Sequence, residues 1–370
     1  MKGNVLKKFL CTCLVTAAAF AATTISASAC TTIYVGGDLV EEGTPFVART
    51  EDYGSDYNKL WFISESGKWK QGDHYVGCPE YGPFEWDFTH DSYRFTYFTN
   101  DIYYDGICPE CGEKADHYSY TEFGTNEKGV SVSATETLYG NEKVTEADPY
   151  RDAEWAEANK SERIGIEETD IPTIILAEAS SAREGVKLLL DIYENYGCVA
   201  ASGVFVCDKD EVWYVENCSG TQYVAIKLND NVIFLEPNMA VIGRIDLDDE
   251  NVIASKDLIA VAKKAGTFVG DEAKNIIDFR ASYARISEKM DQRMIDGLNY
   301  LNAAYKYDSD ALVADNTKFT ISNLDASDKL VALYTNIKAD RKLDKDDVFG
   351  YYKLSSIGKA SNQEIEIFQL

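Results

Sequence analysis

A cysteine directly follows the end of an N-terminal export signal, and this junction determines where the mature chain would begin. Three lysines lie within the first eight residues, and residues 9–25 are apolar or small without any charge. Ala27-Ser28-Ala29 then fits the small-x-small rule for signal cleavage, while the strongly apolar part is short for a bilayer span. Residues 1–29 are therefore the predicted signal peptide, and the folded protein would start at Cys30.

A cysteine at a chain end combines two reactive groups on one residue. Its thiol can act as the nucleophile, and its free α-amino group, which titrates at about 7.7–8.0, can serve as the base for that thiol. Cys30 is therefore the predicted catalytic residue of a self-contained hydrolase. Such chemistry needs no catalytic histidine, no metal and no other cofactor.

Lipid attachment is the alternative use of a cysteine at this position. Bacterial lipoproteins also begin at a cysteine, and their signals usually carry Leu or a similar large residue three positions before it. This chain has Ala27 there, after a Thr24-Ile25-Ser26 segment typical of free secretion. We therefore expect a secreted, extracellular protein, with the cell envelope as the location if Cys30 is lipidated.

The composition describes an acidic globular chain. The 370 residues carry a formal net charge of −26, and loss of the three signal lysines would take it to −29. A surface of this sign disfavours nucleic acid and anionic membranes as partners. The hydrophobic content of 45% allows a sizeable core, in one large domain or two small ones.

The cysteines leave one ambiguous cluster. Two of the nine lie in the signal, so seven remain, and one thiol stays free even if the others pair. Cys108-Pro-Glu-Cys111 resembles half of a zinc knuckle, which Cys78, His74 or His117 could complete. A second C-x-x-C is absent, so disulfides or free thiols remain the alternatives to a structural, non-catalytic zinc ion.

The hydrophobic patterns predict an alternation of strand and helix groups. Residues 31–35 and 45–49 flank a Gly-Gly-Asp turn and predict a hairpin that starts at Cys30. An aromatic and cysteine-rich insertion of short strands and loops is expected at about 54–120. Further strands are predicted at 130–134, 202–207, 211–216, 223–227, 231–234 and 364–368, and a charged turn at 339–347. Helices are predicted at 154–161, 172–179, from Ser180 or Ser181 to Gly197, at 256–264 and over 276–301. This order suits an α+β sandwich of two sheets between helical layers.

Five sequence motifs, in order, carry a resemblance to a known family. Cys30-Thr-Thr-Ile-Tyr-Val-Gly36 and Val47-Ala-Arg49-Thr-Glu-Asp52-Tyr53 form the opening. The later motifs are Asn126–Thr137, the block Trp213-Tyr-Val-Glu216 with Ser219-Gly220 and Tyr223–Lys227, and Pro237-Asn238 with Arg244-Ile-Asp246. Together they resemble peptidase family C69, the dipeptidases related to penicillin V acylase and bile salt hydrolase. The resemblance implies the four-layer αββα sandwich of N-terminal nucleophile hydrolases over residues 30–370.

The resemblance also assigns roles to individual residues. Cys30 matches the nucleophile, and Arg49 and Asp52 match a pair on the second strand of the hairpin. Arg49 would favour the thiolate, and Asp52 could hold the α-amino group. Asn238 matches the position that donates a side-chain N–H to the oxyanion hole. Outside this context, Arg49 and Asp52 would be a surface ion pair and Asn238 a turn residue.

Two features depart from the family pattern. Members usually continue well past the last matched strand, whereas this sequence stops at Leu370, which implies a truncated copy or a part supplied by another polypeptide. The second departure is the insertion at about 54–120, a possible lid or metal-bearing segment. Trp213 and Glu216 of the fourth motif are interpreted as core packing and structural pairing.

The expected function is hydrolysis of dipeptides through an acyl-enzyme on Cys30. The resemblance implies a small peptide substrate whose free amine is bound by an acidic group, for which Glu136 is the candidate. Three alternatives stay open, of which the first two are an amidase or acylase acting on conjugated small molecules and a lipid-anchored envelope protein without catalysis. An inactive exported remnant is a third. The sequence does not determine the oligomeric state.

Overall fold

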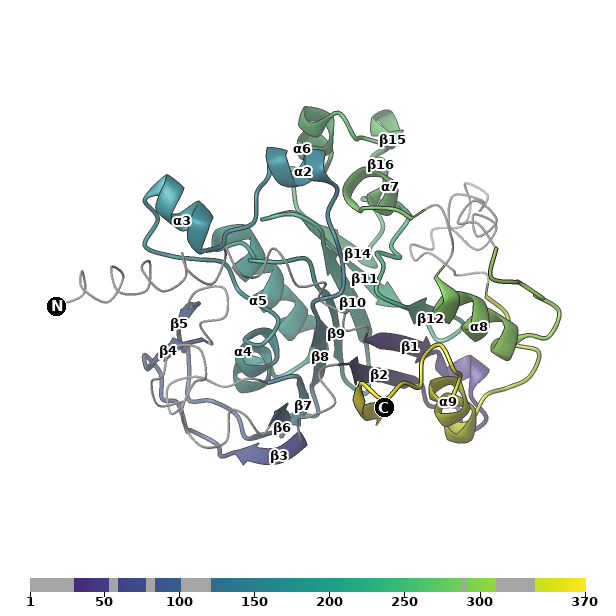
Figure 1. Ribbon diagram of the computed structural model, residues 1–370. Coiled ribbons are helices and arrows are strands. Elements are labelled where there is room, and N and C mark those ends of the chain that lie inside the picture. Colours follow the sequence, from purple (N-terminus) through teal and green to yellow (C-terminus); the bar gives the residue numbers. More distant parts are fainter. Residues whose placement is uncertain (1–29, 53–58, 78–83, 101–120, 288–290, 311–336) are drawn as a thin grey trace.

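The computed structural model describes residues 30–52, 59–77, 84–100, 121–287, 291–310 and 337–370. Within them, the chain forms two large antiparallel sheets with helices on their outer faces (Figure 1). The smaller sheet has the order β12-β1-β2-β17, and the larger has the order β14-β11-β10-β9-β8-β7-β6-β3. The strands are β1 (Thr31–Val35), β2 (Phe46–Asp52), β3 (Lys59–Ser64), β6 (Phe95–Asn100), β7 (Phe123–Asn126), β8 (Ser131–Thr135), β9 (Gly203–Cys207), β10 (Val212–Asn217), β11 (Tyr223–Leu228), β12 (Ile233–Glu236), β14 (Val252–Ala254) and β17 (Asn362–Gln369).

Helices cover the outer face of each sheet. Helices α4 (Ile171–Glu178) and α5 (Ala182–Asn195) pack on the larger sheet, while α8 (Gln292–Leu301) and α9 (Lys345–Tyr352) lie against β12 and β2 of the smaller one. One apolar core fills the space between the two sheets, and a second lies under α4 and α5. The layers therefore run helix, sheet, sheet, helix, and the predicted α+β sandwich is confirmed.

The remaining elements lie around this sandwich. They are β4 (His74–Val76), β5 (Glu85–Asp87), α2 (Glu142–Ala147), α3 (Ala153–Asn159), β13 (Arg244–Asp246), α6 (Leu258–Ala265), β15 (Gly270–Asp271), β16 (Ile276–Asp278) and α7 (Phe279–Tyr283). Short 3₁₀ turns occupy Gly37–Leu39 and Glu272–Lys274. None of the helices in the described part of the chain is both long and apolar enough to cross a membrane.

The predicted hairpin at the start of the chain is confirmed. Strand β1 begins one residue after Cys30 and pairs with β2, so that Thr32 lies opposite Arg49. On its other side β2 pairs with β17, where Glu366 lies opposite Arg49. Strands from both ends of the described chain therefore meet beside Cys30.

Two sequence predictions need correction. The segment 276–301, predicted to be helical throughout, begins with strand β16 because Ile276–Asp278 pairs with β13; helices α7 and α8 follow it. The charged turn predicted at 339–347 ends inside α9, whose first residues are held by a capping box between Asp344 and Asp347.

The described parts of the predicted insertion at about 54–120 join the main sheet. Strands β3 and β6 pair with each other, and β6 pairs with β7. Only β4 and β5 form a separate ribbon. Strands β3 and β6 of this segment therefore extend the eight-stranded sheet at its edge.

Candidate active site

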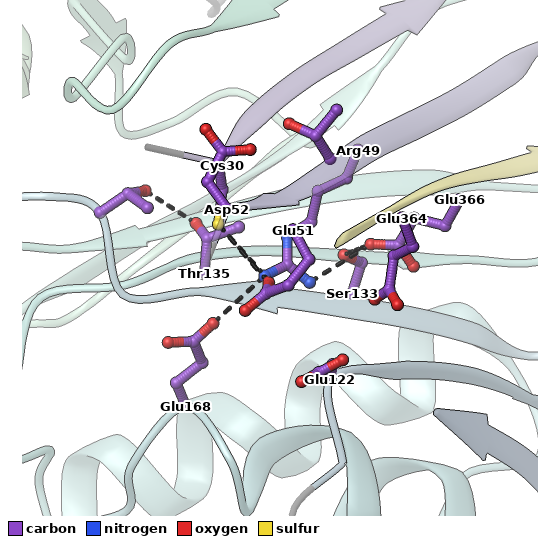
Figure 2. A network of polar contacts seen from close by, with 12 residues as sticks. Cys30, Arg49, Glu51, Asp52, Glu122, Ser133, Thr135, Glu168, Glu364 and Glu366 are labelled. Atoms are coloured by element: carbon purple, nitrogen blue, oxygen red, sulfur yellow. Dashed lines mark hydrogen bonds and ion pairs between the residues drawn. The ribbon is translucent and has the colours of Figure 1, made fainter. Parts of the chain in front are cut away.

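Cys30 directly precedes β1 and is buried, with 5% of its surface exposed. Its thiol lies 3.5 Å from Oε2 of Glu51, to which it donates, and it accepts from Nη2 of Arg49 at 3.4 Å. Figure 2 shows the sulfur, the guanidinium and the Glu51 carboxyl side by side. The hairpin register explains this arrangement, because Arg49 and Glu51 extend from the same face of β2.

Arg49 is the cation at the centre of the site, with 1% of its surface exposed. Its guanidinium pairs with Glu51, with Glu168 at 3.4 Å and with Glu366 at 3.3 Å. Ser133 also donates to Glu366 at 2.7 Å. A buried cation needs such partners, since an unpaired buried charge is strongly destabilising.

Arg49 favours the Cys30 thiolate, as the sequence predicts, but burial and two glutamates outweigh its effect. Burial raises the pKa of the Cys30 thiol well above its usual value, and Glu51 and Glu168 raise it further. Arg49 and a hydrogen bond from the backbone of Asp52 lower the pKa, but they do not offset those effects. The sulfur is therefore held as a neutral thiol that needs a base to take its proton.

Asp52 lies at the end of β2 and is also buried, with 1% exposed. Its Oδ1 accepts a hydrogen bond from the side chain of Asn362. Burial raises the pKa of its carboxyl, against the opposing effects of Lys359 and Arg293. Through its backbone Asp52 hydrogen-bonds the Cys30 sulfur, which brings it beside Cys30. Its predicted role in holding the α-amino group stays a prediction.

Asn238 reaches the site through a residue that the sequence reasoning did not select. Arg293, on α8, donates from Nη1 to the Cys30 carbonyl oxygen at 3.0 Å and to Oδ1 of Asn238 at 3.2 Å. It also donates to the carbonyl of Pro237 at 2.9 Å, while Asp291 accepts from its Nε and Nη2. Because Arg293 binds the oxygen of the Asn238 amide, it fixes which way the Nδ2 donor faces.

Glu136 lies at the edge of the cluster. Its backbone N–H bonds the carboxyl of Glu168, whose pKa is raised mainly by burial and lowered by Arg49. Glu168 in turn lies 3.4 Å from Arg49. The structure thus links the predicted Glu136 to the site through Glu168, which no sequence motif had indicated.

A second charged group continues the cluster away from Cys30. Lys59 of β3 pairs with Glu122 and, at 3.7 Å, with Glu364. Burial raises the pKa of both carboxyls, and Glu51 raises that of Glu122 further. Figure 2 draws Glu51, Glu122, Glu168, Glu364 and Glu366 around this region. Five carboxyls therefore surround the two cations Arg49 and Lys59.

The zinc prediction lies mostly outside the described residues. Cys78, Cys108, Cys111 and His117 fall in segments that the structure does not describe. His74 is described, and it pairs with Asp87 at 2.7 Å and Glu85 at 3.6 Å. In the part of the chain that is described, Cys30, Cys198, Cys207 and Cys218 are free thiols, and no group of three or more potential ligands is arranged to hold a metal.

Comparison with known proteins connects this geometry to one family. The sequence model of peptidase family C69 matches residues 29–370. A probable dipeptidase B of Streptococcus pyogenes serotype M1 is 33% identical over 247 residues, which are 66% of this chain and 45% of that protein. A probable dipeptidase of Salmonella dublin is 32% identical over 262 residues, 70% of this chain and 53% of that protein. The chain thus spans about half the length of the curated relatives that it matches.

Among solved structures, the chain is similar to a penicillin V acylase from Agrobacterium tumefaciens. The two share 11% sequence identity with a TM-score of 0.38, over 92% of this chain and 79% of the acylase.

Proposed function

Because the chain belongs to peptidase family C69, we propose that it is a secreted cysteine dipeptidase whose nucleophile is the Cys30 thiol. One observation carries the proposal: the Cys30 sulfur lies 3.4 Å from the Arg49 guanidinium, while its carbonyl oxygen is bound by Arg293. A cysteine that only carries a lipid anchor would not need these contacts with Arg49 and Arg293. The family match, which begins one residue before Cys30, supports the same assignment.

Activation would follow from removal of the signal. In the full chain the nitrogen of Cys30 is a peptide amide, which cannot act as a base. Cleavage after Ala29 would convert it to a free amine beside a thiol whose raised pKa keeps it protonated. The amine would then take the thiol proton during attack, as in general-base activation of a nucleophile.

The reaction would proceed through a thioester. The sulfur attacks the peptide carbonyl carbon, and the proton from the thiol passes to the α-amine of Cys30. The Asn238 amide, oriented by Arg293, would donate to the oxyanion that forms. The C–N bond then breaks as the leaving amine receives that proton. Water attacks the thioester and gives a proton to the α-amine; the C–S bond then breaks, and the departing sulfur takes that proton back from the amine, which releases the acid and restores the thiol.

The carboxyls around Arg49 and Lys59 suit a substrate with a free amino group. A peptide ammonium entering this buried cluster would favour the ionised form of the nearby carboxyls and would then be attracted by them in a low-dielectric site. Glu136 is the residue that the sequence suggested for this role, and Glu168, bonded to its backbone, is the neighbour that pairs with Arg49. We propose that these two glutamates bind the substrate ammonium, which would make blocked peptides poor substrates.

The first experiment measures hydrolysis of a dipeptide panel by the exported protein, whose mature start is read by N-terminal sequencing and intact mass. The same panel with N-acetylated termini, penicillin V and glycine-conjugated bile salts separates a dipeptidase from an acylase. Cys30→Ser should lose activity by several orders of magnitude, whereas Cys207→Ser, at a buried thiol on β9, should retain it. A diacylglycerol-bearing Cys30, or dipeptides left intact by the cleaved protein, would contradict the proposal.

A further inference from the structure

The loop of residues 237–243, which joins β12 to β13, carries Asn238 into the site. Asn238 has a φ of +54°, a left-handed conformation that Asn tolerates better than most residues. Such a backbone conformation persists only where its surroundings hold it. The position of the Asn238 amide therefore depends on what fixes the rest of this loop.

Glu216 holds the second half of the loop. Its Oε1 accepts from the backbone N–H of Val241 at 2.7 Å, and its Oε2 accepts from that of Ile242 at 3.2 Å. Glu216 belongs to β10 in the larger sheet, whereas the loop leaves an edge strand of the smaller sheet. The carboxyl therefore bridges the two sheets.

The burial of this carboxyl is costly. Glu216 is 0% exposed, and burial raises the pKa of its carboxyl to about 8. An apolar side chain there would avoid that penalty but would leave two buried backbone N–H groups without acceptors. Glu216 thus stabilises the loop by accepting its two amides. Two other bonds hold the loop: the Met239 N–H donates to Glu236 at 3.2 Å, and the Pro237 carbonyl accepts from Arg293.

We propose that Glu216 is a positioning residue, which acts on the reaction by fixing the 237–243 loop and, through it, the Asn238 donor beside Cys30. The proposal rests on the function proposed above. Glu216 bonds the backbone amides of Val241 and Ile242, whereas the side chains that bond the Cys30 thiol are Glu51 and Arg49. Its effect must therefore pass through the loop, and this gives the proposal a specific signature.

The signature is non-additivity with Asn238. Glu216→Gln keeps one acceptor oxygen but places an NH₂ group against a backbone N–H, so the loop should shift. Loss of an oxyanion donor in Asn238→Ala should lower kcat about 100-fold or more, and Glu216→Gln alone should lower it about 10-fold with little change in KM. On the Asn238→Ala background, Glu216→Gln should change kcat less than about twofold, since the two residues act as one unit.

Two further readouts separate positioning from general damage. Alkylation of Cys30 by iodoacetamide uses no oxyanion donor, so its rate should stay within about twofold in Glu216→Gln. The matched control is Asp148→Asn. Asp148 is also a buried carboxyl, and it accepts the backbone N–H of Thr221 at 2.8 Å. This control should lower thermal stability and leave kcat unchanged. If Glu216→Gln does not fold, Glu216→Asp, which withdraws the carboxyl by one methylene, replaces it.

The proposal is overturned if Glu216→Gln lowers kcat by the same factor with and without Asn238, or leaves kcat unchanged. Hydrogen exchange tests the loop independently of any substrate. In the wild-type protein the Val241 and Ile242 amides should be protected, and in Glu216→Gln this protection should fall at least tenfold while β10 keeps its own. If the Val241 and Ile242 amides stay protected in Glu216→Gln, the positioning role is contradicted. If their protection is lost but the wild-type protein hydrolyses no dipeptide, only the proposed function is contradicted.

Discussion

Arg293 donates a hydrogen bond to the carbonyl oxygen of Cys30 at 3.0 Å, although 263 positions separate the two residues. The same guanidinium holds the Asn238 amide oxygen and the Pro237 carbonyl. One side chain from α8 therefore fixes both the residue that carries the nucleophile and the turn that carries the oxyanion donor. The planar fork of arginine makes this possible, because its donors point in several fixed directions.

Replacing Arg293 by Lys should therefore impair catalysis while the charge is kept. Lysine has a single ammonium and cannot reach Cys30, Asn238 and Pro237 together, so kcat for dipeptides should fall at least tenfold. Steady-state kinetics measure the change. Arg285→Lys, at an exposed arginine that lies over the Tyr139 ring, is the matched control and should leave kcat unchanged. Equal activity of the two variants would contradict the role of the fork.

Replacing Arg49 by Gln should destabilise the fold as well as abolish activity. The change leaves the Glu51 carboxylate buried without its cation, and breaking a buried ion pair in this way costs about 3–5 kcal/mol of unfolding free energy. Urea unfolding at neutral pH measures the loss. Lys70→Gln, which breaks the exposed pair with Asp91, should produce little change. A stable Arg49→Gln protein would show that the Glu51 carboxyl is protonated in the variant and needs no cation.

Replacing Glu51 by Gln should make the Cys30 thiol more acidic. Glu51 is the strongest charged group that raises the thiol pKa, and its removal also leaves more of the Arg49 charge to favour the thiolate. The midpoint of the pH dependence of iodoacetamide alkylation should therefore move to lower pH. Glu65→Gln, at an exposed carboxyl outside the site, should leave the midpoint in place. An upward shift would mean that Glu51 stabilises the thiolate.

Stability should fall as the pH rises from about 4.5 toward 8. Burial raises the pKa of Glu366 to about 8, that of Glu216 to about 8 and that of Glu236 to about 7. In this window the folded protein holds protons that the unfolded chain has lost, so raising the pH favours unfolding. Glu366→Gln should reduce the slope by up to about 1.4 kcal/mol per pH unit. Urea unfolding at pH 5, 6.5 and 8 measures how the unfolding free energy changes with pH in the wild type and in Glu366→Gln. A wild-type stability that rises with pH would contradict the raised pKa values of these glutamates.

The opening hairpin could be predicted from the sequence because its information is local. Alternating β-branched residues and a Gly-rich turn specify β1 and β2, and the spacing on β2 then places Arg49 and Asp52 near Cys30. Asn238 was predicted from its motif, and the structure brings it to Cys30 through Arg293. Glu51 lies inside the same motif, and its position two residues from Arg49, on the same strand face, was the signal that could have identified it.

The remaining site residues could not be predicted because they depend on long-range pairing. Along β17 the order Glu-Ile-Glu-Ile suggests isoleucines inside and glutamates outside, yet Ile365 is 38% exposed and Glu366 only 4%. The inversion arises because β17 lies beside β2, where the Arg49 guanidinium accepts Glu366 as a partner. Arg293 and Glu168 likewise lie on segments whose place in the fold is set by sheet packing, and no local pattern distinguishes them from surface charges.

The order of strands in the smaller sheet has a consequence for the protein during its synthesis. Strand β2 is made early, but its outer neighbour β17 comes from residues 362–369, more than 300 positions later. Until the ribosome has made that segment, β2 has an open edge and Arg49 lacks Glu366. The Cys30 thiol therefore lies beside an incomplete ion-pair cluster until residues 362–369 have been made. Competence would then require two separate events, the pairing of β17 with β2 and the removal of the signal before Cys30.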